Sequence, residues 1–457
     1  MQRPPEPEPK SNKAAKSSFL LTDTLDFLAS AEVVVETRDS TVYRGVLEES
    51  SSPLDVLDPP PPNLVSPLGP RVEHIVISGG GAGAAPSRLS SAIASLLPCG
   101  GVPLEFAERL IAFGAVHWSP IPPAIGHAVA LRDELVRERG IKDPTHPRYA
   151  CRRAKPSDGE VAGYGTYIRV HLQPRRFPAA LRTDWSKRVV EGLDSEHYVV
   201  IDKPYGVGVP PTVDNAEENC LHMTRRVLGL EDLRITHRLD QPTSGVLVLA
   251  RTKEFASYFN GLLARRDGSV RKHYKVFTRR EVPRGALDEE GVLTHYARVG
   301  VRAAKSKTRT VMYDEDAEGR HVCKLRVLGS EAVVDGGGKV QGYETEVVLM
   351  TGRTHQIRAQ FAAVGCPVVG DTVYDGRGED SARYREGEFE FLEKIGLQAC
   401  KMAVKDESSS PSPKYFPAQG IEFSALSDPW WRVELSGVEW SGVRVEFEWS
   451  WSGVDRT

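Results

Sequence analysis

The chain has 457 residues, of which 40% are hydrophobic and 26% charged, so it can form two or three folded domains. Its formal net charge of −3 excludes a uniformly basic nucleic-acid-binding protein but permits a local basic groove. No apolar run reaches the length of a membrane span, so no membrane partner is expected. The six cysteines form neither a CxxC pair nor a zinc-ligand pattern, which predicts free thiols and no metal site.

The N-terminal part of the chain contains little regular periodicity. Residues 1–17 are rich in proline and charge, which predicts disorder, and they lack the apolar core of a secretory signal. Residues 18–80 combine an alternating apolar segment, a Ser- and Pro-rich stretch and the short apolar run VEHIVIS. The following GGGAGAAP partly matches a dinucleotide-binding loop. Pro86 and the lack of a second strand ending in an acid favour a turn or linker. The sequence supports no particular cellular compartment.

Residues 87–178 predict a small α+β segment. SRLSSAIASLL and PLEFAERLIAFG have helical periodicity, and Gly114 suits the end of the second helix. GTYIRVHLQP predicts a returning strand. The segment also carries four basic residues that permit RNA binding, although solvated charges on a plain spacer remain an alternative: Arg109, Arg169, Arg175 and Arg176.

From about residue 190 the pattern becomes regular. EHYVVIDKPYGVGV predicts a strand and a turn, and helices are expected over Leu221–Leu230 and Lys253–Arg266. A last helix is expected in THQIRAQFAAVG, with Thr354 as its N-cap and Gly365 just beyond its end. Strands outnumber helices, so we expect an α+β fold with a mixed, mainly antiparallel central sheet.

The segment HRLDQPTSG contains the first candidate for chemistry. Asp240 lies two residues from Arg238, and the hydroxyls of Thr243 and Ser244 can bind the loop backbone. Gly245 permits an unusual φ before the apolar run VLVLA. A carboxylate held without water beside a guanidinium is a usable nucleophile or base. Taken alone, however, the pattern favours a salt-bridged turn.

Two other segments change that balance. Tyr274 lies among basic residues in RKHYK, which suits either a stacking platform in an RNA groove or a surface aromatic on a basic edge strand. TGRTHQIR places a dense polar cluster at a loop-to-helix junction, where phosphates bind readily. A capped helix with exposed charges is the alternative. The cluster contains Arg353, His355, Gln356 and Arg358, and DKPYGV adds Lys203 in a tight turn.

These segments resemble the motifs of the RluA-type RNA pseudouridine synthases. HRLDQPTSGVLVLAR resembles the family signature, IDKPYGVGV its preceding turn and RKHYKVF its strand tyrosine. VLMTGRTHQIRAQFAAVGCPVVGDTVY resembles its last motif, and all four follow in the family's order. The resemblance implies a catalytic domain over residues 190–450 that isomerises uridines in rRNA or tRNA. It also implies a monomer that needs no cofactor or metal.

The resemblance further implies roles for single residues. Asp240 would be the catalytic carboxylate, acting on a flipped-out uridine by attack on the ribose or the ring, or by removal of a ribose proton. Tyr274 would stack on the uracil, with a possible second role as a base, and Arg358 would pair with Asp240. Arg238 would enter the space that the target base leaves. Further substrate-binding residues would be Lys203, Thr243, Arg353, His355 and Gln356.

Two weaker resemblances concern the N-terminal segments. Residues 18–80 resemble a degenerate Sm-like β module, although SSSPLDVL and Ser78 depart from that family's RNA-contact residues. Residues 87–178 resemble a degenerate alpha-L RNA-binding domain. In the catalytic segment, Gln398 stands where the family has a histidine. The alternative function is a non-catalytic RNA-binding protein that retains the synthase fold, which predicts loss of catalytic residues that are in fact present.

Overall fold

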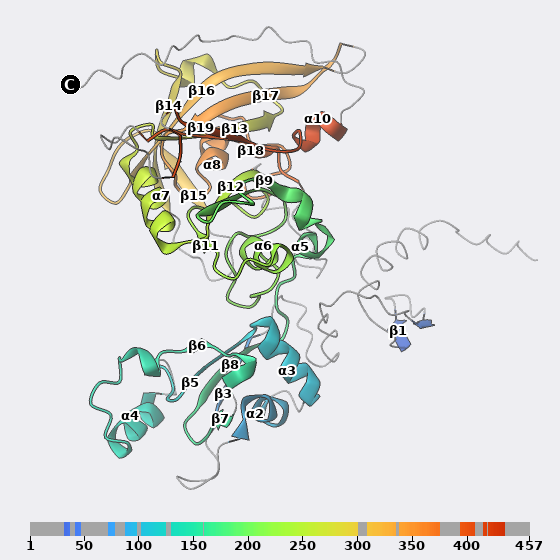
Figure 1. Cartoon of the computed structure of the whole chain (residues 1–457), viewed down its shortest axis with the longest axis vertical. Helices are drawn as coiled ribbons and strands as arrows, with labels where there is room; N and C mark the ends of the chain where they lie inside the picture. The colour runs from blue at the N-terminus through green and yellow to red at the C-terminus, as the bar shows by residue number, and fades with distance from the viewer. Residues whose placement is uncertain are drawn as a thin grey trace, which may run out of the picture. The chain divides into compact units, whose positions relative to one another are not determined.

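The computed structural model contains two compact units (Figure 1). Unit 1 comprises Met1–Ser66 and Pro70–Gln173, and unit 2 comprises Pro67–Gly69 and Pro174–Thr457. The structure describes residues 32–36, 42–46, 72–77, 87–97, 102–124, 129–158, 160–299, 309–334, 338–374, 394–406, 415–417 and 419–434. The predicted disorder of residues 1–17, the GGGAGAAP turn and the C-terminal tail after residue 434 lie outside these ranges.

Unit 1 contains a four-stranded antiparallel sheet with the order β3-β8-β5-β6. Two helices, predicted from their periodicity, share an apolar core with this sheet through residues such as Ile93, Leu110 and Ile168. The second helix ends at Gly114, whose φ of 79° is the left-handed conformation expected there. The strands are β1 (Glu32–Glu36), β2 (Val42–Val46), β3 (Val72–Val76), β4 (Ser87–Arg88), β5 (Val116–Ser119), β6 (Arg152–Arg153), β7 (Glu160–Ala162) and β8 (Tyr167–His171), and the helices are α2 (Leu89–Leu96), α3 (Leu104–Phe113) and α4 (Val129–Glu138).

The pairing of β3 changes the expected division of the N-terminal part. Residues Val72–Val76 pair antiparallel with β8 along their whole length. The run VEHIVIS was predicted to belong to the Sm-like module, yet it forms part of the same sheet as the next segment. A boundary between residues 80 and 87 therefore does not separate two sheets. Whether either segment is an RNA-binding module stays a prediction.

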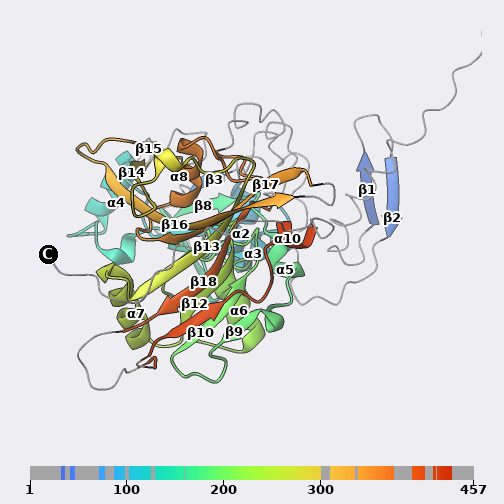
Figure 2. The same cartoon turned by 90° about the horizontal axis from the view of Figure 1, so that it is seen from above.

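Unit 2 is built on one large sheet. Its order is β15-β14-β16-β17-β13-β18-β12-β10-β9 (Figure 2). In addition, β11 pairs with β12 and β19 pairs with β18. Among the described strand pairs of this sheet only β12 and β18 are parallel, so the expected α+β fold with a mainly antiparallel sheet is confirmed. The strands are β9 (Val189–Glu191), β10 (Tyr198–Lys203), β11 (Arg234–Ile235), β12 (Ser244–Ala250), β13 (Val270–Thr278), β14 (Val292–Val299), β15 (Thr310–Tyr313), β16 (His321–Val334), β17 (Val340–Leu349), β18 (Leu397–Val404) and β19 (Ile421–Ser424).

Both faces of the central strands are buried. On β12, Leu247 and Leu249 face one apolar cluster, whereas Val246 and Val248 face the other, as the two-residue period of a strand requires. Helix α8 contributes Phe361 to the first cluster and α7 contributes Phe255 to the second. This double burial explains why β12 reads as the uninterrupted apolar run VLVLA. The helices of unit 2 are α5 (Pro178–Arg182), α6 (Cys220–Leu228), α7 (Lys253–Arg265), α8 (Gln356–Ala363) and α10 (Trp430–Glu434).

The start of α8 differs from the prediction. His355, not Thr354, is the N-cap, with a left-handed φ of 54° and no side-chain capping bond. The carbonyl of Thr354 accepts a hydrogen bond from the Thr310 hydroxyl at 2.8 Å. Gln356 folds back instead, and its side-chain oxygen accepts from the backbone N–H of Arg353 at 3.1 Å. The capping prediction was wrong because the helix begins one residue later than expected, and its N-cap residue, His355, makes no side-chain capping bond.

Candidate active site

The loop that carries Asp240 is fixed to β12 on its N-terminal side. The hydroxyl of Thr236 donates to the carbonyl of Val248 at 2.6 Å, and the backbone N–H of Val248 donates to Nε2 of His237 at 3.1 Å. Burial lowers the pKa of His237 to about 3, so the imidazole is neutral and can accept this bond. The histidine of HRLD therefore holds the loop.

Lys203 fixes the same loop on its C-terminal side. It is completely buried at the end of β10, and its ammonium donates to the carbonyls of Pro204, Gln241 and Thr243 at 2.8, 3.1 and 2.7 Å. Burial lowers its pKa to about 8, which leaves most molecules protonated at neutral pH. Three donors thus meet three main-chain acceptors. The predicted substrate-binding lysine instead uses its donors to hold the turn that follows Asp240.

Arg358 connects α8 to the acidic residues of the site. Its Nη1 lies 3.1 Å from Oδ2 of Asp240, so the predicted pair is present. Its Nε and Nη2 donate to both carboxylate oxygens of Asp371 at 2.6 and 2.7 Å. Burial lowers the pKa of Arg358, but the hydrogen bonds and charges of Asp371 and Asp240 outweigh burial and raise it overall. The guanidinium is a permanent cation bound to two acids.

The sequence reasoning did not identify Asp371. Its carboxylate is fully buried and also accepts a hydrogen bond from the backbone N–H of Val373 at 3.0 Å. It lies in GDTVY, at the end of the last family motif. The position of this acid just after an apolar segment was the available sign that Asp371 is important. Its contact with Arg358 in α8, however, depends on the fold.

His355 is the second basic group near Asp240. Its Nε2 lies 3.9 Å from Oδ2 of Asp240, and its Nδ1 lies 3.1 Å from the hydroxyl of Tyr374. Burial lowers the pKa of His355, and the charge of Asp240 opposes that shift. A neutral imidazole at physiological pH is the consequence.

Tyr274 lies on β13 in the apolar core, with 6% of its surface exposed. Burial and the charge of Asp240 both raise its pKa, so the phenol is protonated at neutral pH. The expectation of a surface aromatic on an edge strand is wrong, because β13 pairs with β17 on one side and β18 on the other.

The remaining predicted residues fall into two groups. Thr243 is buried, and the side chain of buried Gln356 is bound to Thr351 and to the carbonyl of Lys324. Arg238 is exposed, and Arg353 is half-buried with a buried Nε that has no hydrogen-bond partner among the described residues. The exposed side chain of Arg238 is thus open to a ligand, whereas the Nε of Arg353 lies inside the protein.

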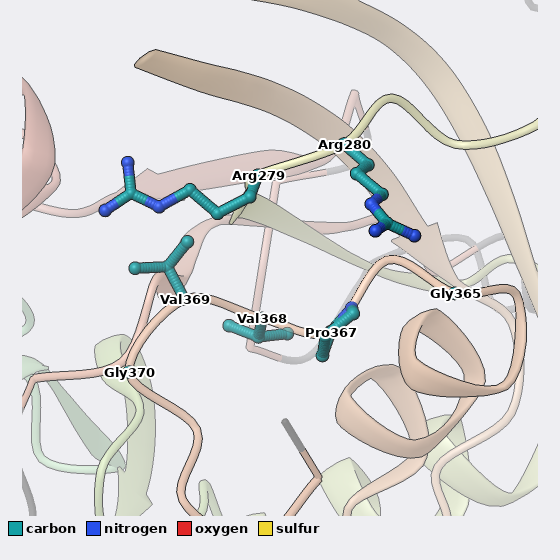
Figure 3. A pocket seen from close by; sticks show the side chains of 7 residues that line it. All are labelled: Arg279, Arg280, Gly365, Pro367, Val368, Val369 and Gly370. Carbon is teal, nitrogen blue, oxygen red and sulfur yellow. The ribbon is translucent and has the colours of Figure 1, made fainter. Parts of the chain in front are cut away.

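A separate pocket of about 280 Å³ lies beyond the end of β13 (Figure 3). The side chain of Arg280 points toward Gly365 and Pro367 there. None of the predicted site residues lines it, so the pocket is separate from the predicted site. Its lining comprises Arg279, Arg280, Gly365, Pro367, Val368, Val369 and Gly370.

Two further findings concern other site types. Within the described ranges, no three His, Cys, Asp or Glu side chains gather closely enough to hold a metal ion. No helix among the described residues has the length and apolarity to cross a bilayer.

Comparison with known proteins identifies the family. The sequence model of the protein family described as RNA pseudouridylate synthase matches residues 197–363. RNA pseudouridine synthase 6, chloroplastic, from Arabidopsis thaliana is 30% identical over 80% of this chain and 82% of its own length. The chain belongs to the RNA pseudouridine synthase family. The expected enzyme class is thereby confirmed.

Other members of the RNA pseudouridine synthase family match shorter parts of this chain. RNA pseudouridine synthase 6, chloroplastic, from Oryza sativa subsp. japonica is 37% identical over 60% of this chain, and the match spans 60% of its own length. The tRNA pseudouridine synthase C of Vibrio parahaemolyticus is 31% identical over 55% of this chain and 95% of its own length. Nearly the whole of this bacterial relative thus corresponds to about half of the chain.

Proposed function

We propose that this chain isomerises specific uridines of rRNA or tRNA to pseudouridine, with Asp240 as the catalytic carboxylate. The observation that carries the proposal is the Asp240–Arg358 ion pair at 3.1 Å, on a loop fixed from both sides. The Asp240 side chain is 19% exposed, whereas that of Arg358 is 4% exposed. The carboxylate can therefore reach a substrate while its partner stays in the protein.

The isomerisation conserves all atoms of the nucleoside. The glycosidic C–N bond breaks, the uracil turns while it is held, and a C–C bond forms to the ribose. Asp240 acts on the ribose or on the ring, and Arg358 holds it in one orientation. A preorganised ion pair of this kind needs no reorganisation at the moment of reaction.

Arg238 and Tyr274 have different surroundings, which supports different roles. Arg238 is exposed two residues from Asp240, so it can enter the space that a flipped base leaves in the RNA. Tyr274 has a protonated phenol in the core near Asp240, which favours contact of its ring with the uracil over removal of a proton.

The alternative is an RNA-binding protein that retains the fold without catalysis. Such a protein has no need of a buried arginine bound to two acids, because burying unpaired or partly paired charges is costly. The complete chain of contacts from Asp371 through Arg358 to Asp240 favours the enzyme.

The test is the Asp240→Asn variant. It should lose pseudouridine formation by about 10⁴-fold or more, since a catalytic group is removed while the shape is kept. Pseudouridine mapping of total RNA, from cells with the active and the mutated gene, would also identify the target. Asp314→Asn, which changes a carboxylate that is 96% exposed, serves as the control and should keep full activity.

RNA binding by the Asp240→Asn protein should stay within about threefold of wild type, because the side chain is isosteric. An Asp240→Asn protein that forms pseudouridine at the wild-type rate would refute the role of Asp240. Complete loss of sites in the mapping experiment with intact RNA binding would support it.

A further inference from the structure

Tyr205 is an exposed aromatic residue close to the catalytic loop. Its relative exposure is 40%, and no other phenylalanine, tyrosine or tryptophan whose burial the structure describes is classed as exposed. It follows Lys203 and Pro204 in the DKPYGV turn after β10. With 40% of its surface open to solvent, the ring offers area on which a ligand can stack.

The backbone that carries Tyr205 is rigidly attached to the catalytic loop. The N–H of Gly206 donates to the carbonyl of Gln241 at 2.9 Å, and Nε2 of Gln241 donates back to the carbonyl of Gly206 at 3.2 Å. Gln241 directly follows Asp240. Because these bonds use the main chain and other side chains, the Tyr205 ring is not needed to build the turn.

A cation lies beside the Tyr205 ring. The Nζ of Lys394 is 5.1 Å from the ring centroid. The carbonyl of Lys394 packs against Gly370, where a Cβ atom would come within 2.5 Å of it. Gly370 precedes Asp371, which binds Arg358. Tyr205 therefore lies on a turn that is bound to the Asp240 loop, and Lys394 lies on a segment that packs beside Asp371.

We propose that Tyr205 and Lys394 form a stacking site for a nucleobase of single-stranded RNA that neighbours the uridine in the active site. The inference rests on the proposed function and adds a substrate contact to it. Part of the Tyr205 ring is open to solvent, so a base can stack there, and the Lys394 ammonium beside the ring adds positive charge that attracts the RNA backbone. Aromatic rings combined with cations bind single strands with little dependence on base identity.

The experiment measures binding of two fluorescein-labelled probes to the full-length chain by fluorescence anisotropy. One probe is a ten-unit oligouridylate, and the other is a ten-unit abasic oligonucleotide with the same charge. Tyr205→Ala should weaken oligouridylate binding by about five- to tenfold, at the lower end of the known range for one stacked base. It should leave binding of the abasic probe unchanged.

Two further variants separate the contribution of the ring from that of the charge. Tyr205→Phe keeps the ring and should bind the oligouridylate within about twofold of wild type. Lys394→Gln removes the charge and should weaken binding of both probes, because both carry phosphates. Thermal melting of each variant shows that the fold is kept.

Any of three results would overturn the stacking site. Tyr205→Ala could bind the oligouridylate as tightly as wild type, or it could lose affinity for both probes equally. The third result is that the wild type shows no measurable binding of the oligouridylate. Pseudouridine formation by the wild type is measured separately. Binding that depends on Tyr205 without any pseudouridine formation would refute the proposed function and keep the stacking site.

Discussion

Asp371 controls how Arg358 meets Asp240. Of the three hydrogen bonds that the Arg358 guanidinium donates to the two acids, two go to Asp371, at 2.6 and 2.7 Å, and one goes to Asp240 at 3.1 Å. The shorter, bidentate pair fixes the plane of the guanidinium, and the single longer contact follows from that plane. Asp371 is therefore a positioning residue that acts on the carboxylate through Arg358.

Asp371→Asn should lower kcat for pseudouridine formation by about tenfold to a hundredfold, with little change in RNA affinity. The amide keeps one acceptor but loses the charge, so Arg358 can turn away from its present plane. The free energy of unfolding should fall by about 3 kcal/mol, the lower end for a broken buried ion pair. Rapid single-turnover kinetics and urea unfolding measure the two effects.

Asp214→Asn is the matched control for Asp371→Asn. Asp214 is also buried, and its carboxylate also binds an arginine, Arg175, through two nitrogens at 2.9 to 3.2 Å. Its hydrogen bonds among the described residues go to Arg175 and Thr212 and not to the loop that carries Asp240. The control should lose stability and keep kcat. Equal kcat values for the Asp371→Asn protein and the wild type would show that Asp371 does not position the site.

The sequence predicted the residues that belong to a recognisable motif. It did not predict contacts between residues that only the folded chain brings together. The Asp240–Arg358 pair was expected from HRLD and HQIR. Asp371 was missed because its contact with Arg358 depends on how the chain returns after α8. Lys203 was assigned to the substrate because a buried lysine bound to three carbonyls has the same sequence appearance as an exposed one.

At the scale of secondary-structure elements, β12 and β18 approach each other closely at Gly245. This second residue of β12 has a φ of 113°, and a Cβ atom there would lie 2.1 Å from the carbonyl oxygen of Ala399. The two strands pair in parallel at this point. Because Gly245 lies five residues after Asp240, this contact also restrains where the Asp240 loop lies.

Gly245→Ala should destabilise the protein by several kcal/mol or prevent its folding, since both the φ and the contact with backbone exclude a side chain. Gly261→Ala provides the matched control. Gly261 lies inside α7, where an added Cβ meets nothing within 4 Å. That change should stabilise the protein by about 0.5–1 kcal/mol. Urea unfolding of both variants tests the pair, and a Gly245→Ala protein as stable as wild type would contradict the geometry.

Elements with strong local signals were predicted well. Helix α7 was expected at Lys253–Arg266 and occupies Lys253–Arg265, because its apolar period and its Thr252 cap are both local. The pairing of β3 with β8 was not predicted, since it joins residues 91 to 99 positions apart, from Val76 with Tyr167 to Val72 with His171. Periodicity indicates that a strand exists, but long-range packing decides which sheet it joins.

At the scale of the whole molecule, the boundary between the two units lies at residues 173 and 174. Arg175 and Arg176 were predicted to belong to the second N-terminal segment. In the structure they bind Asp214 and Glu218, which are buried in unit 2. The compact unit that contains Asp240 thus includes residues 174–189, which lie before the predicted start at residue 190, and the bounds of the catalytic domain stay a prediction.

A protein consisting of residues 174–457 should fold by itself and keep kcat within about tenfold of the full-length chain. Unit 2 has its own apolar core and contains the whole Asp240 site. Its affinity for RNA should fall if unit 1 contributes contacts, which filter binding measures against the full-length chain.

A second truncation, residues 191–457, tests whether the boundary is placed correctly. It removes Arg176, the partner of Glu218, and Trp185, which is 2% exposed in the unit 2 core. A buried glutamate without its cation and a cavity of tryptophan size together should prevent folding. We therefore expect cooperative melting of the longer fragment and none of the shorter one. Aggregation of the longer fragment under conditions where the full-length chain folds would show that unit 2 depends on unit 1.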